Sequence, residues 1–343
     1  MTHPITQMRR EVLEIPSAVD RLLTQGAGDI KRAASALRER NPAFMISVAR
    51  GSSDHVATYF KYASELLMGV PVASVGPSVA SIYKRKLNVA GSACVSVSQS
   101  GKSPDIVEMA RLAGASGALS IAMTNDASSP LAQVCDHTLN LHAGPELSVA
   151  ATKTFVTSAV TAIWLLAEWS GDAELQAAIN GLPGALERAV KEDWPDVFAA
   201  IGARNSLFCL GRGPASAISN EAALKFKETC QLHAESYSSA EVLHGPVSIV
   251  DTGFPVIALT AQDAAEEVLV QVSDEIAAKG ATVFVTSDKT KTANQLPAVR
   301  TGHSLTDPIA LIASFYAMVE TIAVSRGINP DAPRHLNKVT ETV

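Results

Sequence analysis

The sequence predicts an α/β protein of two tandem domains, each with a mostly parallel sheet flanked by helices in three layers. Short apolar runs that end in Gly or Ser alternate with helical patterns, which is typical of strands joined by crossover helices. This alternation occurs twice along the chain. A length of 343 residues and a hydrophobic content of 47% suffice for two cores of ordinary size.

The first half contains three strand–turn units and a closing helix. Strands are expected at FMISVAR (44–50), CVSVSQSG (94–101) and ALSIAMTND (118–126). Helices are expected from about Ser53, over about 104–112 and over about 150–169.

The second half repeats this pattern. Its expected strands are SLFCLGRG (206–213), FPVIALTAQ (254–262) and GATVFVTSD (280–288). Matching strand ends give offsets of 211 − 51 = 160, 260 − 98 = 162 and 280 − 117 = 163 residues. Offsets this similar indicate a duplicated α/β domain.

The patterns also suggest where the domains begin and end. A Pro-containing tail follows a last helix over about 307–326 and would by itself be expected to fray. The predicted segments are a helical N-terminal segment (1–25), a first domain (26–170), a helical connector (171–200), a second domain (201–327) and the tail (328–343).

Composition argues against several classes of protein. A net charge of −6 without long charged runs leaves no basic surface for nucleic acid. The N-terminus has no signal-peptide run, and the longest apolar run, FVTSAVTAIWLLAEW, is shorter than a membrane span. The four cysteines are scattered without metal-binding spacing. We therefore expect a cytoplasmic protein that binds neither nucleic acid nor a membrane.

Two turns at the ends of neighbouring strands are rich in hydroxyls, GSSDH (51–55) and SQSGKSPD (98–105). Ligands of open parallel sheets bind beyond the carboxyl ends of the strands, where amide groups and helix N-termini attract anions. Ser and Gly can also serve only as helix caps in such turns. Two such turns side by side favour anion binding, with the candidate ligands Ser98, Gln99, Ser100 and Ser103.

Neither turn has a nucleotide-binding signature. The chain contains no GxxxxGK[ST], and no complete GxGxxG follows a predicted strand. A small sugar phosphate is therefore a better candidate ligand than a nucleotide.

The stretch EAALKFKETCQLHAESYSSAEVLHGP (221–246) gathers many titratable groups in a sparsely charged chain. Glu221, Lys225 and Glu228 share one helical face because they are spaced i, i+4 and i+7. On spacing alone, a solvated face with an ion pair is the more common interpretation. The helix follows directly from a predicted strand end, however, and this position favours a site.

The end of this stretch is expected to be loop-like and to supply His233, Glu235, Glu241 and His244. A lysine beside Glu228 is expected to pair with that carboxylate, and the histidine at the Gly-Pro turn is a candidate proton carrier. Such groups can move protons on a polyhydroxylated substrate. A metal site is a weaker interpretation, because no HxxxH or HExxH occurs.

Long motifs in the same order make the chain resemble the sugar isomerase domain pair of glucosamine-6-phosphate synthase. They extend over nearly the whole sequence and are RGSS (50–53), SQSGKSPD, ELSVAATKTF (146–155), LGRG, EAALKFKE, HAESYSSAEVLHGP and PRHLNK (333–338). The resemblance implies two flavodoxin-like sugar isomerase (SIS) domains. Because Thr2 follows Met1 where the synthase has a cysteine nucleophile, we expect no glutaminase activity.

The resemblance also implies roles for individual residues. Glu228 would be the base that moves a proton between C1 and C2 of the open-chain sugar, oriented by Lys225 and Glu221. His244 would open the sugar ring, in a site shared across a homodimer. Lys338 would contact the keto sugar or form an imine with it, which gives the tail a reason to be ordered.

The remaining residues would hold the substrate. Those implied for the phosphate and nearby hydroxyls are Ser52, Ser53, Ser98, Gln99, Ser100 and Ser103, with Val149 lining the site. One departure is the sequence Gly101-Lys102-Ser103, where the synthase has Gly-Glu-Thr; the charge of Lys102 is expected to affect substrate approach. No metal or organic cofactor is required, since side chains alone can transfer a proton next to a carbonyl.

Three functions fit these residues. The first is a glucosamine-6-phosphate deaminase that forms fructose 6-phosphate and ammonia, and it is the one we expect. The second is a deglycase of 6-phosphorylated fructosyl-amino acids, which uses the same proton transfer. The third is a sugar-phosphate sensor, which the retained Glu228, His244 and Lys338 disfavour.

Overall fold

The structure, a computed structural model, describes residues 5–338 in two compact units. Unit 1 is built from the residues up to Pro16, Leu147–Thr152 and Gly181–His335. Unit 2 is built from Ser17–Glu146, Lys153–Asn180 and the residues from Leu336. Thr2 and residues 339–343 of the predicted tail lie outside the described residues.

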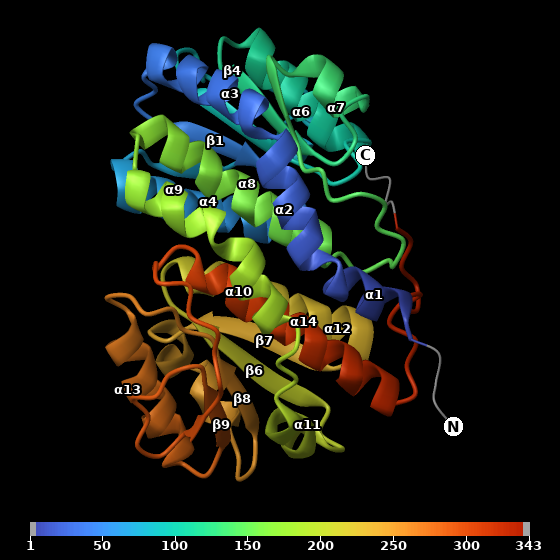
Figure 1. Cartoon of the computed structure of the whole chain (residues 1–343), viewed down its shortest axis with the longest axis vertical. Coiled ribbons are helices and arrows are strands. Elements are labelled where there is room, and N and C mark those ends of the chain that lie inside the picture. The colour runs from blue at the N-terminus through green and yellow to red at the C-terminus, as the bar shows by residue number, and fades with distance from the viewer. Residues whose placement is uncertain (1–4, 339–343) are drawn as a thin grey trace. The chain divides into compact units, whose positions relative to one another are not determined.

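Unit 2 contains a five-stranded parallel sheet in the order β2-β1-β3-β4-β5 (Figure 1). The central strands are buried along their whole length, as expected when helices cover both faces. Ile46 and Val48 pack with Ile106 and Met109 in the core beneath α6. The strands are β1 (Met45–Val48), β2 (Val72–Ser74), β3 (Ala93–Val97), β4 (Leu119–Thr124) and β5 (His137–Asn140).

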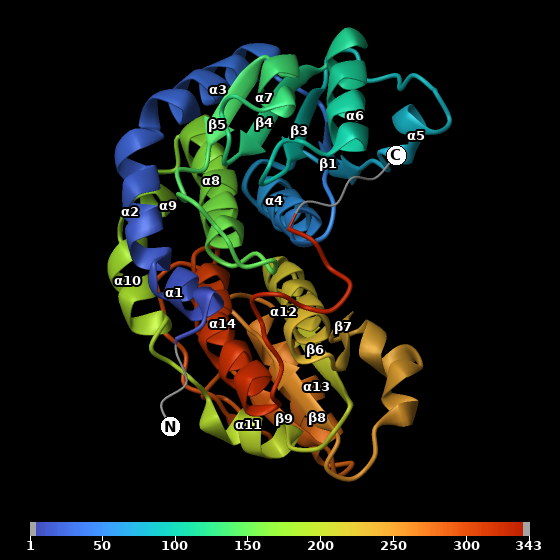
Figure 2. The ribbon, with the colours of Figure 1, turned by 90° about the vertical axis from the view of Figure 1, so that its right-hand side faces the viewer.

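The helices of unit 2 lie on both faces of this sheet, with α3 and α8 on one face and α6 on the other (Figure 2). This arrangement is the three-layer architecture that the sequence predicts. The helices are α2 (Ile15–Gln25), α3 (Ala27–Arg40), α4 (Ser52–Met68), α5 (Ser78–Ser81), α6 (Pro104–Ala115), α7 (Pro130–Val134), α8 (Lys153–Ser170) and α9 (Ala173–Asn180).

Unit 1 contains a second parallel sheet, in the order β10-β9-β8-β6-β7. It is covered by α12 and α14 on one face and by α13 on the other (Figure 1). Its strands are β6 (Ser206–Gly211), β7 (His233–Ser238), β8 (Pro255–Ala258), β9 (Thr282–Val285) and β10 (Asn294–Gln295). Its helical elements are α1 (Gln7–Leu13), α10 (Leu182–Ala189), α11 (Pro195–Ile201), α12 (Pro214–Cys230), α13 (Glu266–Ala277), α14 (Asp307–Ser325) and the 3₁₀ turns η1 (Glu241–His244) and η2 (Pro246–Ile249).

The predicted duplication is evident in α4 and α12, which have 17 residues each and follow the first strand of their sheets. Each begins after a glycine of almost the same backbone conformation, with φ/ψ of 54°/−134° at Gly51 and 58°/−136° at Gly213. The offset is thus 213 − 51 = 162, in line with the other two offsets. Pairing Gly51 with Gly211, as the sequence suggested, was wrong by two residues.

The segment that begins at His233 is a strand, β7, and not the loop that the sequence suggested. It pairs with β6 alone and so forms an edge of the sheet. Edge strands often carry charged side chains, which prevent their unpaired backbone from pairing with another chain. The sequence of β7 therefore lacks the apolar run by which the other strands were predicted. Glu235 therefore lies on the sheet, whereas Glu241 and His244 lie in η1.

Among the described residues, α14 is the one helix long and apolar enough to span a membrane. Of its most apolar 18-residue window, 83% is buried inside the protein. Its side chains, among them Phe315 and Tyr316, are buried. The apolar character of α14 is therefore that of a core helix.

Candidate active site

Three titratable residues of α12 form a connected cluster in unit 1, and we call them the α12 row: Glu221, Lys225 and Glu228. Pro214 at the first turn and a left-handed Gln231 at the C-terminus define the helix that carries it. Lys225 Nζ lies 3.3 Å from Glu221 Oε1 and donates a hydrogen bond to Glu228 Oε2. The predicted shared face is confirmed.

The interpretation of this row as a solvated face is wrong. The side chains of Glu221 and Lys225 are both 0% exposed, and only Lys227, off the row, is exposed. Burial alone would lower the pKa of Lys225, but the neighbouring Glu221 and Glu228 carboxylates raise it above its usual range. Lys225 is therefore a buried cation held by two carboxylates. Such groups are costly to bury and are frequent at functional sites.

Glu228 is the accessible member of the row, with its side chain 21% exposed. Its Oε2 accepts the hydrogen bond from Lys225. Glu221, at the buried end, also accepts a hydrogen bond from the Tyr316 hydroxyl of α14 at 2.9 Å. The row therefore has one partly exposed carboxylate, Glu228, next to the buried Lys225 and Glu221.

In unit 2, the serine-rich turn 98–103 lies at the carboxyl end of β3. The Ser98 hydroxyl accepts a hydrogen bond from the Gly101 amide at 3.2 Å, and the Ser100 hydroxyl accepts one from the Lys102 amide at 3.3 Å. Gly101 has a φ of 61°, which favours glycine, and a Cβ there would lie 2.1 Å from Ser129 Oγ. The turn is thus a compact loop with polar groups at the carboxyl end of the central strand β3.

Helix capping does not explain the serines of these two turns. The N-cap of α6 is Ser103, but its side chain makes no capping hydrogen bond. The N-cap of α4 is Gly51, which places Ser52 and Ser53 in the first turn of the helix. The placement agrees with anion binding at two neighbouring helix N-termini.

An ion pair that sequence reasoning missed joins the two turns. Arg50 Nε donates to Asp105 Oδ2 at 2.9 Å, and the side chain of Asp105 is 0% exposed. Asp105 Oδ1 also accepts a hydrogen bond from the Ile106 amide. The available signal in the sequence was the acid of the SPD motif, to which no role was given. Lys102 is exposed and lies 3.7 Å from Asp126.

Lys338 is held by a second acid that sequence reasoning missed. Its Nζ donates to Oε2 of Glu146 at 2.9 Å, and the side chain of Glu146 is 0% exposed. Glu146 also accepts hydrogen bonds from the amide and hydroxyl of Thr154 at the start of α8. A lone acid in the apolar segment GPELS was the available signal.

Val149 belongs to a segment of unit 1 that is held by the buried acid Glu11 and by a backbone hydrogen bond. Glu11 of α1 accepts hydrogen bonds from the Leu147 amide and from the amide and hydroxyl of Ser148. The Val149 amide donates to the carbonyl of Asp331 at 3.1 Å. Glu11 could have been found because helical spacing places it with Met8 and Val12 on the buried face of α1.

His244 ends η1 and is exposed. It precedes Gly245, whose φ of 143° breaks the turn. Together with Val149, His244 and the α12 row lie in unit 1. The predicted residues that lie in unit 2 are Ser52, Ser53, Ser98, Gln99, Ser100, Ser103 and Lys338.

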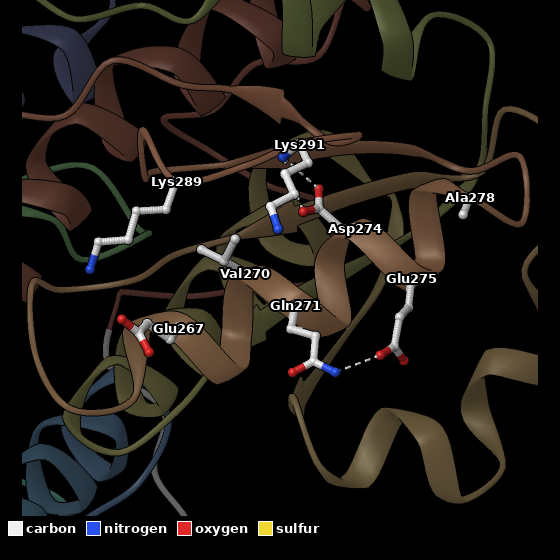
Figure 3. Close-up of a pocket in the computed structure, with 8 residues that line it drawn as sticks. All are labelled: Glu267, Val270, Gln271, Asp274, Glu275, Ala278, Lys289 and Lys291. Carbon is white, nitrogen blue, oxygen red and sulfur yellow. Dashed lines mark hydrogen bonds between the residues drawn. The ribbon is translucent and has the colours of Figure 1, made fainter.

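A separate cavity of about 560 Å³ lies along α13 in unit 1 (Figure 3). Gln271 donates to Glu275 at its rim, and Asp274 accepts hydrogen bonds from the amides of 291–293. None of its lining residues is a predicted site residue. Within residues 5–338, no group of three His, Cys, Asp or Glu side chains is placed to hold a metal.

These features define a duplicated α/β protein with a hydroxyl-lined turn in one unit and a lysine–carboxylate row in the other. The profile of the SIS domain family matches residues 36–168 and 201–326. The chain belongs to the SIS domain family.

Several relatives of the chain share one name. A glutamine–fructose-6-phosphate aminotransferase (isomerizing) of Symbiobacterium thermophilum is 34% identical over 319 residues, covering 85% of this chain and 50% of the relative. The chain spans about half the length of the curated relatives it matches.

Two solved structures are similar over almost the whole chain. A protein of Silicibacter pomeroyi, provisionally named a phosphosugar isomerase, is 64% identical with a TM-score of 0.93, covering 95% of this chain and all of that one. The C-terminal domain of glucosamine-fructose-6-phosphate aminotransferase from Francisella tularensis is 26% identical with a TM-score of 0.83, covering 97% and 99%.

Proposed function

We propose that this protein converts glucosamine 6-phosphate to fructose 6-phosphate and ammonia. The observation that carries the proposal is the buried Lys225 between two carboxylates, of which Glu228 alone is accessible. The names of the relatives, which include fructose 6-phosphate and the term isomerizing, support this class of substrate. The serine-rich turns of unit 2 supply the donors that a phosphate monoester requires.

The proposed chemistry is a proton transfer followed by hydrolysis. His244 assists opening of the pyranose ring, which exposes the C1 aldehyde. Glu228 removes the proton from C2, and return of a proton to C1 leaves an imine at C2. Water adds to this carbon and ammonia leaves, so that one glucosamine 6-phosphate and one water give one fructose 6-phosphate and one ammonia.

The test is to give the purified protein two substrates. With glucosamine 6-phosphate we expect stoichiometric release of ammonia and fructose 6-phosphate, measured by coupled assays. With a fructosyl-lysine 6-phosphate we expect no free lysine. Release of lysine without ammonia would replace the proposal with the deglycase, and turnover of neither substrate would reject both activities.

The role of Glu228 is tested by Glu228→Gln. We expect kcat to fall by at least about 10²-fold, the usual contribution of a general base, with binding of a sugar phosphate almost unchanged. Calorimetry with fructose 6-phosphate measures the binding. Glu187→Gln, on the exposed surface of α10, is the matched control and should retain full activity. If Glu228→Gln instead abolishes binding, Glu228 has a structural role.

A further inference from the structure

The hydroxyl of Tyr316, on α14, contacts Glu221 of the α12 row. Tyr316 is 0% exposed, and its Oη donates to Oε1 of Glu221 at 2.9 Å, across 95 residues of sequence. Its ring is fixed by aromatic packing, because Phe315 lies edge-on to Tyr316 and to Phe226 of α12. The hydroxyl is therefore held in place by two helices.

Glu221 and Glu228 compete for the same cation. Lys225 Nζ is 3.3 Å from Glu221 Oε1 and closer to Glu228 Oε2. The Glu221 oxygen nearest the lysine is the one that accepts from Tyr316. The hydrogen bond from the tyrosine hydroxyl stabilises the negative charge on this Glu221 oxygen. The oxygen therefore attracts the Lys225 ammonium less strongly. The tyrosine thereby biases the ammonium toward Glu228.

We propose that Tyr316 is a positioning residue for the catalytic base. It acts through Glu221 and Lys225 and need not contact the substrate. Without its hydroxyl, Glu221 loses a donor in a buried site, and Lys225 Nζ, 3.3 Å from the same oxygen, can then interact more strongly with it. Lys225 would then turn toward Glu221, and Glu228 would lose part of its orientation and of the charge that supports it. This inference rests on the proposed function.

The variant Tyr316→Phe removes one oxygen and keeps the aromatic packing. We expect kcat for ammonia release to fall roughly tenfold, a fraction of the general-base contribution, with KM unchanged. Tyr237→Phe is the matched control, since Tyr237 also donates from its hydroxyl to a carboxylate, Glu235, at 2.7 Å in the same unit. It should retain wild-type kcat. An unchanged kcat in Tyr316→Phe overturns the inference, as does an equal loss in the two variants.

A double-mutant cycle separates positioning from general structural damage. Glu221→Gln keeps an oxygen that accepts from Tyr316 but removes the charge that competes for Lys225. If Tyr316 acts through Glu221, adding Tyr316→Phe to Glu221→Gln should lower kcat by much less than the tenfold loss in the wild-type background. The same fold loss in both backgrounds would show that Tyr316 acts by another route.

A readout without turnover distinguishes failure of this inference from failure of the proposed function. If the wild-type protein releases no ammonia, the proposed function fails. In that case the ammonium signal of Lys225 in protein labelled with ¹⁵N-lysine still reports its hydrogen-bond partner. We expect the signal to shift in Tyr316→Phe and to stay in place in Tyr237→Phe. A signal that is the same in both variants and the wild type overturns the positioning role.

Discussion

At the scale of single residues, Gly101 is predicted to be irreplaceable in the serine-rich turn. Its φ of 61° disfavours any side chain, and a Cβ would lie 2.1 Å from Ser129 Oγ and 2.9 Å from Thr124 Oγ1. Gly101→Ala should lower the free energy of unfolding by about 2–4 kcal/mol, from backbone strain and overpacking together. It should also weaken binding of a sugar phosphate, because the turn must move. Chemical denaturation and calorimetry measure the two effects.

The control for Gly101 is Gly171, in the same unit, which has a φ of 76° and would have nothing within 4 Å of an added Cβ. Gly171→Ala should cost only the backbone strain, about 1–2 kcal/mol, and leave ligand binding intact. Equal losses of stability in the two variants would contradict the predicted clash with Ser129.

A second prediction for single residues concerns the reactivity of the four cysteine thiols. Burial raises the pKa of Cys94, Cys135 and Cys230 to about 12, and burial also raises the pKa of Cys209. At pH 8, well below these values, almost no thiolate is present, and the thiolate is the reactive form. We expect all four thiols to react slowly with a disulfide reagent in the native protein and rapidly in guanidinium. A fast-reacting thiol in the native state would be at odds with this prediction.

At the scale of elements, α1 has seven residues and depends on contacts with the rest of unit 1. Asp331 accepts hydrogen bonds from the Gln7 and Met8 amides at its N-terminus, and Arg9 pairs with Glu320 of α14 at 2.7 Å. Through Glu11 the helix holds Leu147 and Ser148. The N-terminal helix is therefore a support for the segment that carries Val149.

Glu11→Ala should accordingly affect both stability and ligand binding. It removes a carboxylate that accepts hydrogen bonds from the Leu147 amide and from the amide and hydroxyl of Ser148, and each hydrogen bond to a charged group contributes roughly 1.5–3 kcal/mol. We expect a clear fall in melting temperature and a higher KM. Glu11→Gln, which keeps one carbonyl oxygen as acceptor, should recover part of both. A KM that stays at the wild-type value in Glu11→Ala would separate α1 from the site.

The elements also show what the sequence could and could not predict. The buried strands β1, β3, β4, β6, β8 and β9 were predictable because each is a short apolar run that ends in a turn. The strand β7 was not, because its edge position permits polar residues. The face of Glu221, Lys225 and Glu228 follows from helical spacing, but its burial depends on α14, 95 residues away at Tyr316. Glu11, Asp105 and Glu146 were missed because each acts on a segment brought near by folding.

At the scale of the whole molecule, the two sheets share one topology but have different side chains at equivalent turns. The helix after the first strand begins with Ser52 and Ser53 in unit 2 and with Pro214 and Ala215 in unit 1. The first pair supplies hydroxyls, whereas the second supplies none. In α12 the polar groups come later, at Glu221, Lys225 and Glu228. The two copies of the scaffold thus carry different sets of the predicted site residues, hydroxyls in unit 2 and the lysine–carboxylate row in unit 1.

We further propose that the protein forms a homodimer in which His244 serves the site of the neighbouring subunit. His244 is exposed, and so are the adjacent apolar side chains Leu243 (41%) and Ile249 (56%), as expected of residues that contact another protein. Each heterodimer of His244→Ala and Glu228→Gln chains would then contain one intact site and one site with both defects. Random exchange makes half of the dimers mixed, so about a quarter of wild-type activity should return.

This recovery is measured by mixing the two inactive proteins after unfolding and joint refolding, with each protein refolded alone as the control. Mixing His244→Ala with a Lys225→Ala/Glu228→Gln chain should give the same recovery. Both changes of the second chain lie in the one site of the mixed dimer that is already inactive, so the other site stays intact. Mixing His244→Ala with a His244→Ala/Glu228→Gln chain should give none, because no intact histidine is present. If each site is built from one chain, it needs His244 and Glu228 of the same chain. No chain in these mixtures has both residues, so no mixture would regain activity.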